Sequence, residues 1–181
     1  MTGKILLVAG KSGTGKTTIV NELERSYGLR SVVSYTTRPR RSEDEQGHLF
    51  VTDQEFDRLN LTASSDYGGY RYGATEEQIE ESDLYIVDVK GIEYLKEHYR
   101  GSKEPVVLRI VTSEDPSEDF ATRYERMVKR GDGYEAASKR VALDTSEFRK
   151  LEKLADYTIV NREGRNIQEV CEEICEICGI L

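Results

Sequence analysis

The stretch GKSGTGKT, residues 10–17, follows the apolar run ILLVA at residues 5–9 and precedes the amphipathic pattern TTIVNELERSYG. It satisfies the spacing G-x4-G-K-[ST] of a loop that binds phosphates. Its glycines let backbone N–H groups curl around an anion with no Cβ in the way. A short continuous apolar run is typical of a central parallel strand that is covered on both faces, and the helical pattern ends at Gly28. This order of strand, loop and helix predicts a site for a nucleoside triphosphate.

Two side chains of this loop have distinct expected roles. Lys16 can reach the β- and γ-phosphates of ATP, and the Thr17 hydroxyl can ligate Mg²⁺. The helix that begins near Lys16 points its positive end at the same anion. Asp88 ends the apolar run of residues 84–87 and is also expected near the metal, although the same pattern occurs at ordinary strand ends. The residues expected to bind ATP here are Gly10, Ser12, Gly13, Thr14, Gly15, Lys16, Thr17 and Thr18.

The rest of the chain alternates apolar runs with helical patterns. Strands are predicted at 30–34, 48–51, 84–89, 106–111 and 157–160, and helices at 17–28, 92–99, 115–130 and 134–154, with a C-terminal helix that stops at Gly179. Capping boxes that begin at Thr52 and Thr75 predict two short helices. Residues 60–72 are interpreted as irregular.

Strands that alternate with helices indicate an α/β fold, here a P-loop core with a parallel sheet flanked by helices. We expect one domain over residues 1–181. Within it we expect a core at 1–34 and 81–181, a small inserted lobe at about 35–80 and a helical lid at about 123–142.

Charge and hydropathy exclude several classes of function. The net charge of −8 and the pI near 5.0 argue against nonspecific binding to nucleic acid or to a membrane surface, where a basic excess supplies the affinity. The N-terminal apolar run is too short for a signal peptide or a membrane span. We therefore expect a cytoplasmic protein, either a monomer or a homodimer.

The three cysteines, Cys171, Cys175 and Cys178, lie close together near the C-terminus. Their spacing superficially matches an iron–sulfur motif. Spacings of four and three also place all three thiols on one helix face, among Val170, Ile174 and Ile177, where free cysteine behaves as a small buried hydrophobe. We predict a packing role and no metal at these residues.

A second group of cations indicates what accepts the phosphate. A kinase for a monophosphate needs no residue to orient water, but it needs cations that hold two repelling anions in line. Forked guanidinium donors suit this task. We interpret Arg123, Lys129, Arg40 and Arg149 as solvated surface charges. The predicted catalytic residues are Lys16, Arg38, Arg126, Arg130 and Arg140, with Arg41 as a further phosphate ligand.

Six segments in the same order resemble the guanylate kinase family. They are GKSGTGKTT, SYTTRPRR followed by Gly47, YRYGAT, LYIVDVKG, RMVKRG with Lys139-Arg140, and DYTIVN. The resemblance implies a lobe for a nucleoside monophosphate and a lid bearing arginines that closes over ATP. It implies that Arg38, Arg41 and Tyr72 bind the acceptor phosphate, that Ser34 approaches the base, and that Asn161 lies near the adenine. Arg126, Arg130 and Arg140 would then serve the transferring phosphoryl group.

The acceptor lobe departs from the pattern of that family. His48 stands about where the family has a tyrosine that binds phosphate. The glutamate that reads guanine has no clear counterpart, with Ala63 or Asp66 nearest. A Ser/Thr that contacts the base is replaced by Ala74, beside Thr75. Asp88 can therefore serve either Mg²⁺ or the acceptor base. The predicted acceptor site comprises Ser34, Arg38, Arg41, His48, Tyr72, Thr75 and Asp88.

The leading hypothesis is ATP- and Mg²⁺-dependent phosphorylation of a nucleoside monophosphate, with GMP or dGMP as the first acceptor. Another (d)NMP or a ribose bisphosphate is the alternative within the same class. A catalytically silent module that binds peptides is an alternative of a different class, because DVKG resembles a string in such scaffolds. Those modules have usually lost the phosphate loop, which is intact here. A regulatory GTPase lacks support, because no motif for reading the guanine base of GTP is evident.

Overall fold

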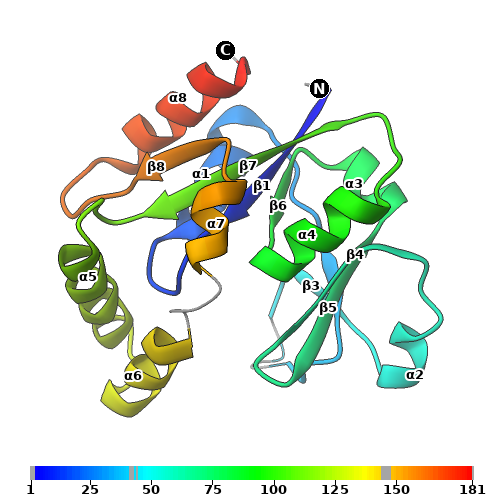
Figure 1. The fold of residues 1–181 in the computed structure, drawn as a ribbon, viewed down its shortest axis with the longest axis horizontal. Coiled ribbons are helices and arrows are strands. Elements are labelled where there is room, and N and C mark those ends of the chain that lie inside the picture. The colour runs from blue at the N-terminus through cyan, green and yellow to red at the C-terminus, as the bar shows by residue number, and fades with distance from the viewer. Residues whose placement is uncertain (1–2, 41–42, 44, 144–147, 181) are drawn as a thin grey trace.

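The computed structural model describes residues 3–40, 43, 45–143 and 148–180 (Figure 1). In this part of the chain the strands form two four-stranded sheets. The first has the order β6-β1-β7-β8, with β6 (Leu84–Ile86), β1 (Lys4–Ala9), β7 (Glu104–Val111) and β8 (Tyr157–Val160). All three pairings are parallel. The predicted α/β class with a parallel sheet flanked by helices is confirmed.

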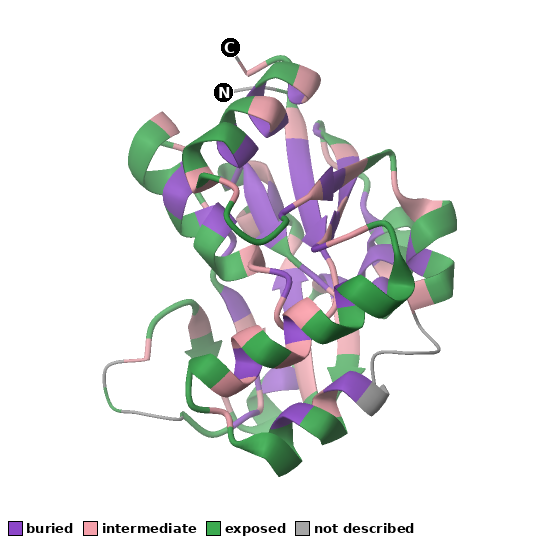
Figure 2. Ribbon diagram, turned by 90° about the vertical axis from the view of Figure 1, so that its left-hand side faces the viewer, coloured by how far each residue is buried: buried purple, intermediate pink, exposed green. Residues whose placement is uncertain are grey.

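Helices cover both faces of the parallel sheet. On β1, Ile5 and Leu7 pack in a cluster with residues of α4 (Val89–His98) and α7 (Phe148–Leu154). Leu6 and Val8 point the other way, into a cluster with α1 (Lys16–Tyr27) and α8 (Ile167–Cys178). Buried positions therefore run along the central strands in Figure 2. Because β1 is buried on both faces, its sequence is a continuous apolar run.

The predicted helix ends are confirmed at α1 and α8. Gly28 and Gly179 both adopt φ 66°, the left-handed conformation that glycine supplies at a helix C-terminus. The three cysteines lie on α8 and are buried against α1 and the sheet. Burial raises the pKa of the Cys171 thiol to about 12 and that of Cys175 to about 11. The described residues contain no group of three or more His, Cys, Asp or Glu side chains that could hold a metal ion.

The second sheet forms the lobe and has the order β3-β2-β5-β4. Its strands are β2 (Ser34–Thr36), β3 (His48–Phe50), β4 (Leu61–Tyr67) and β5 (Tyr70–Thr75). Strand β2 pairs parallel to β3 and antiparallel to β5. The short helices α2 (Asp53–Phe56) and α3 (Glu76–Glu81) begin at the two predicted capping boxes. These two predictions are confirmed.

The irregular assignment of residues 60–72 is wrong, because β4 and β5 form an antiparallel hairpin there. Gly68 and Gly69 have φ 60° and 83° at its turn. Two central residues with positive φ match the twist of a hairpin, so Gly-Gly is a favoured pair at this place. The signal was present as Tyr-Gly-Gly-Tyr. This signal was hidden because β4 carries short polar side chains, whereas a strand usually alternates apolar with polar residues.

Three further boundaries differ from the prediction. The strand expected at 84–89 ends at Ile86, since Asp88 caps α4. The strand expected at 30–34 contributes one bridge, from Ser31 to Leu84, before β2 begins. The helix expected at 134–154 is two helices, α6 (Tyr134–Leu143) and α7, and residues 144–147 between them lie outside the described part.

The lid helices and the lobe lie on opposite sides of the phosphate loop. Helix α5 (Pro116–Lys129), capped by Asp115 as expected, leads into α6. Figure 1 shows α5 and α6 to the left and the lobe to the lower right, with the loop that follows β1 between them. This arrangement brings the two predicted groups of cations toward one loop.

Candidate active site

The loop between β1 and α1 packs tightly on its neighbours. Gly13 and Gly15 have φ 85° and 93°, which side chains rarely adopt. A Cβ at Gly13 would lie 2.7 Å from the Arg123 carbonyl oxygen, and one at Gly10 would lie 2.5 Å from the Ile110 carbonyl oxygen. The glycines of the motif are thus required by the approach of other backbone as well as by the anion.

One cavity of about 250 Å³ opens over this loop. The Lys16 ammonium folds back over the loop and donates to the carbonyls of Gly10 (2.7 Å) and Lys11 (3.0 Å). Arg130 and Arg140 reach the same cavity from the lid. The structure therefore brings most of the predicted ATP ligands together with two lid arginines. The lining residues are Ser12, Gly13, Gly15, Lys16, Thr17, Thr18, Tyr67, Arg130 and Arg140.

Asp132 holds the two lid arginines, and sequence reasoning missed it. Its Oδ2 accepts from Arg130 Nε at 3.0 Å and from Arg140 Nη1 at 3.0 Å. One carboxylate thus gathers two guanidinium groups next to the phosphate loop. This pairing depends on the bend at Gly131 and Gly133, both with positive φ, which lies between the helices predicted at 115–130 and 134–154.

Arg126 and Asn161 lie together on the other side of the loop. Arg126 donates to the Asn161 carbonyl at 3.0 Å and pairs with Glu163. The buried Asn161 amide donates from Nδ2 to the Thr14 carbonyl at 2.8 Å. Arg126 does not line the cavity that holds Arg130 and Arg140. The structure thus gives Asn161 a contact with the loop itself, and its place near the adenine stays a prediction.

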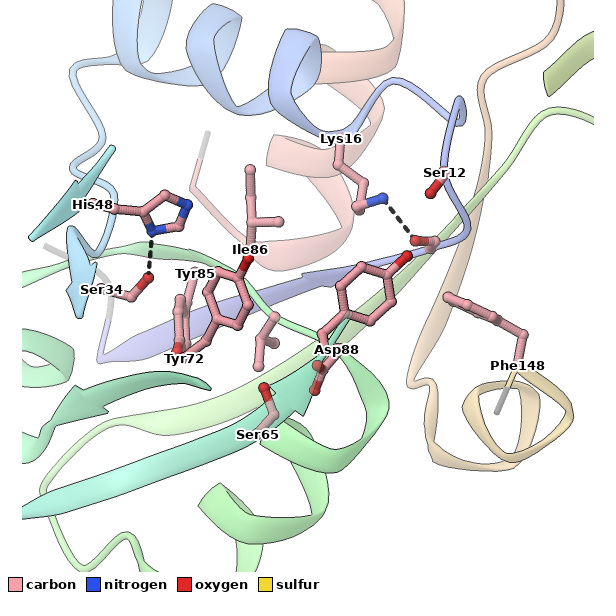
Figure 3. Close-up of a pocket in the computed structure, with 13 residues that line it drawn as sticks. Ser12, Lys16, Ser34, His48, Ser65, Tyr72, Tyr85, Ile86, Asp88 and Phe148 are labelled. Atoms are coloured by element: carbon pink, nitrogen blue, oxygen red, sulfur yellow. Dashed lines mark hydrogen bonds between the residues drawn. The ribbon is translucent and has the colours of Figure 1, made fainter. Parts of the chain in front are cut away.

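A second cavity, of about 240 Å³, lies between the loop and the lobe (Figure 3). It brings Ser34, His48, Tyr72 and Asp88 together with Lys16. Ser34 Oγ and His48 Nδ1 lie 3.0 Å apart in a hydrogen bond, and His48 meets the Tyr72 ring edge-on at 5.7 Å. The lining residues are Gly10, Ser12, Lys16, Ser34, His48, Ser65, Tyr67, Tyr72, Tyr85, Ile86, Val87, Asp88 and Phe148.

Arg38 is buried beside this cavity and is held by Glu45. Its guanidinium meets the Glu45 carboxylate through two contacts, Nη2 to Oε1 at 2.6 Å and Nη1 to Oε2 at 3.3 Å. The hydrogen bonds that Arg38 donates to Glu45 raise the pKa of Arg38. Arg38 lines an adjoining cavity together with Ser34, His48 and Tyr72. Arg41 lies outside the described residues.

The lining of this second cavity differs from the expected base site. Thr75 accepts from the Gln78 amide as the cap of α3 and does not line the cavity. Ala63 and Ala74 face each other across β4 and β5 and are fully buried, whereas Asp66 is exposed. Neither Ala63 nor Asp66, the two positions nearest to the missing glutamate, lines this cavity.

Ser65 and Asp88 line this second cavity instead, across from Lys16 in Figure 3. Asp88 Oδ1 accepts from the Gly91 amide at 2.8 Å, which fixes the carboxylate at the start of α4. Among the described lining residues, Asp88 supplies the one carboxylate. Burial, with the charge of Asp88, raises the pKa of Tyr85. Ser65 escaped sequence reasoning because its position depends on the hairpin.

Arg123 is not a solvated charge, so that interpretation is wrong. Only 2% of the residue is exposed, and it contacts both Asp119 and the phosphate loop. Lys129, Arg40 and Arg149 are exposed as expected. The i, i+4 spacing of Asp119 and Arg123 was the available signal.

The family model for guanylate kinase matches residues 2–178. The chain belongs to the guanylate kinase family. A guanylate kinase of Thermotoga maritima is 29% identical over 191 residues, covering 98% of this chain and 86% of that protein. One of Neisseria meningitidis serogroup A is 30% identical over 192 residues, covering 98% and 89%.

A solved guanylate kinase structure from Anaplasma phagocytophilum matches with a TM-score of 0.64 at 22% identity, covering 99% of this chain and 86% of that one. This likeness shows that the fold of guanylate kinases is shared. Within the residues described, no helix combines the length and apolar character needed to cross a membrane.

Proposed function

We propose that this member of the guanylate kinase family transfers the γ-phosphoryl group of ATP to a nucleoside monophosphate, with GMP or dGMP as the first acceptor. The observation that supports this is the meeting of two cavities at one lysine. Ser12 and Lys16 line both the cavity with the lid arginines and the cavity with Ser34, His48 and Tyr72. A donor and an acceptor phosphate can therefore approach each other at the Lys16 ammonium.

The described residues are suited to this chemistry without a general base. A monophosphate oxygen is already an anionic nucleophile, so alignment and charge neutralisation carry the catalysis. Lys16, Arg130 and Arg140 would hold the transferring group, and Arg38 and Tyr72 the acceptor phosphate. Arg41 and Arg126 remain proposed ligands of the same two groups.

The residues present also fit the Mg²⁺ that accompanies ATP. Magnesium is commonly held by one or two protein oxygens together with phosphates and water. Thr17 lines the phosphate cavity, and the Asp88 carboxylate lines the adjoining one. When bound, the ion would neutralise charge on the β- and γ-phosphates.

A different acceptor is the second candidate, and the alanine pair favours it. A carboxylate that accepts from two N–H groups discriminates guanine strongly, but Ala63 and Ala74 supply no polar side-chain atom. Recognition of the base would rest on Asp88, Ser65 and Ser34. These groups suit guanine and also other bases that carry an amino or imino N–H, or a sugar bisphosphate.

The test is ADP release from Mg-ATP with GMP, dGMP, AMP, UMP, CMP, dTMP and a ribose bisphosphate offered separately. We expect turnover with GMP or dGMP. Turnover with another acceptor alone would preserve phosphoryl transfer and change the substrate. A protein that binds ATP but phosphorylates none of these acceptors would overturn the proposal.

A further inference from the structure

A buried ion pair lies directly against the phosphate loop. Asp119 and Arg123 are one turn apart on α5, and the Arg123 Nε donates to Asp119 Oδ2 at 2.8 Å. The side chains are 5% and 2% exposed. Removing two charges from water is costly unless their remaining hydrogen-bonding groups are also satisfied. The other contacts of this pair therefore indicate what it holds in place.

Asp119 joins three segments of the chain. Its Oδ1 accepts from the Thr112 amide at 3.0 Å and from the Thr112 hydroxyl at 2.9 Å, at the end of β7. The Lys11 ammonium of the phosphate loop lies 3.6 Å from its Oδ2. Burial alone would raise the pKa of Asp119, but the Thr112 amide and the Arg123 charge hold it below its usual value. The carboxylate is thus ionised and fixed.

Arg123 connects this carboxylate to the middle of the loop. Its Nη1 donates to the Ser12 carbonyl at 3.2 Å. The carbonyl and the following N–H of a trans peptide point in opposite directions. Because Arg123 holds the Ser12 carbonyl on the α5 side, the Gly13 N–H is directed away from α5. Gly13 lines the cavity that also contains Lys16 and Thr17.

Asn161 acts in the same way two peptides further on. Its amide holds the Thr14 carbonyl at 2.8 Å, which orients the Gly15 N–H. Gly13 also packs on the backbone of Arg123 itself. The loop is therefore held from outside at two carbonyls, those of Ser12 and Thr14, and the first contact comes from the helix that leads into the predicted lid.

We propose that Asp119 and Arg123 are positioning residues that preset the phosphate loop for the triphosphate and attach the lid helix α5 to it. Neither side chain contacts a substrate in this scheme. The inference rests on the proposed function only in that the loop binds ATP. Under this proposal, Asp119 and Arg123 affect the affinity for ATP, whereas the lobe recognises the acceptor.

The test is the Arg123→Lys variant. Lysine keeps the charge beside Asp119 but lacks the fork that also reaches the Ser12 carbonyl. We expect the Kd for a non-hydrolysable ATP analogue with Mg²⁺, measured by titration calorimetry, to rise about tenfold. We expect the KM for the acceptor at saturating ATP to change less than about twofold.

Arg109→Lys is the matched control. Arg109 donates to Thr158 at 3.1 Å and pairs with Glu152 at 4.0 Å, and neither of these partners belongs to the loop. The Arg109→Lys substitution should lower the melting temperature of the protein without altering the Kd for the analogue. If Arg123→Lys also loses only thermal stability, the pair is merely structural and the proposal is overturned.

Asp119→Asn provides the same comparison if Arg123→Lys does not fold, because asparagine keeps the shape and an acceptor for Thr112. It should also weaken analogue binding and leave the acceptor KM near that of the wild type. Unchanged analogue affinity in this variant would overturn the proposal. Analogue binding needs no turnover, so a wild type that binds ATP but phosphorylates no acceptor would contradict the proposed function without contradicting this pair.

Discussion

The Glu45 carboxylate occupies the Arg38 donors that, under the proposed function, bind the acceptor phosphate. The two contacts, at 2.6 and 3.3 Å, resemble the fork geometry with which arginine binds phosphate. An incoming acceptor would exchange one anion for another at a site that is already formed. Glu45 thus keeps the buried Arg38 guanidinium paired, and the proposed function implies that the acceptor phosphate replaces it.

We predict that Glu45→Gln lowers the KM for the acceptor about fivefold, since a neutral amide competes less strongly for Arg38 than a carboxylate. The kcat should change little. Initial rates at saturating Mg-ATP measure both constants. Glu43→Gln, at an exposed position on the same loop, is the control and should leave them unaltered. A higher KM in Glu45→Gln would mean that Glu45 orients Arg38 for the acceptor.

Lys16 is one of the described residues that line both cavities. We predict that Lys16→Ala lowers kcat at least about a hundredfold, because a preorganised cation at the transferring phosphoryl is lost. The circular dichroism spectrum should remain native, since the Lys16 ammonium bonds to carbonyls of its own loop. Wild-type turnover in this variant would refute the role assigned to the loop.

Helix α3 is fixed at its C-terminal end by Glu80. This carboxylate accepts from the Ser102 amide at 2.9 Å, the Ser102 hydroxyl at 2.6 Å and the Tyr99 hydroxyl. These hydrogen bonds, with Ser102 first, lower the pKa of Glu80 to about 2. A helix of the lobe is thereby attached to the segment that precedes β7.

The pKa of Glu80 in the folded protein lies below the usual value of 4.5. The stability that the ionised Glu80 contributes to the folded protein is therefore fully present above that pH. We predict that it is lost as the pH falls from about 4.5 toward 2. Urea unfolding at several pH values measures how steeply the free energy of unfolding changes with pH. Glu80→Gln should be less stable at neutral pH and should lose less stability on acidification. Glu81→Gln, an exposed neighbour on α3, should retain the slope of the wild type.

Elements with local signals could be predicted from the sequence, and elements that depend on pairing could not. The phosphate loop, the capping boxes at Thr52 and Thr75, and the final helix are specified by residues close together in the chain. The hairpin of β4 and β5 was missed because Thr62, Ser64 and Ser65 interrupt the alternation of apolar and polar residues in β4. The same limit applies to the site. Lys16 follows from spacing, whereas Ser65 reaches the cavity, and Arg123 the loop, only through tertiary contacts.

At the scale of the whole molecule, the lobe and the parallel sheet share one hydrophobic cluster. Ala63, Ala74 and Ile79 of the lobe pack in the same cluster as Ile5 and Leu7 of β1. The lobe therefore has little separate core of its own. This packing favours a single cooperative unit over two independently stable parts.

We predict one unfolding transition for the whole chain. Urea melts followed by far-ultraviolet circular dichroism and by tyrosine absorbance should coincide, and the eleven tyrosines cover both sheets. Ala63→Gly should lower the midpoint seen by both probes by the same amount. Two separated midpoints would show that the lobe unfolds by itself.

The three thiols on α8 make the undocking of this helix measurable through the rate at which they are labelled. Buried thiols with raised pKa values, as at Cys171 and Cys175, react slowly with alkylating reagents while the helix is docked. Each labelling event therefore records a moment at which α8 has left α1, the helix that carries Lys16 and Thr17 at its start. Labelling with and without ATP would show whether occupancy of the loop changes the rate at which α8 leaves α1. In this way the cysteines can report on the stability of the nucleotide site without taking part in it.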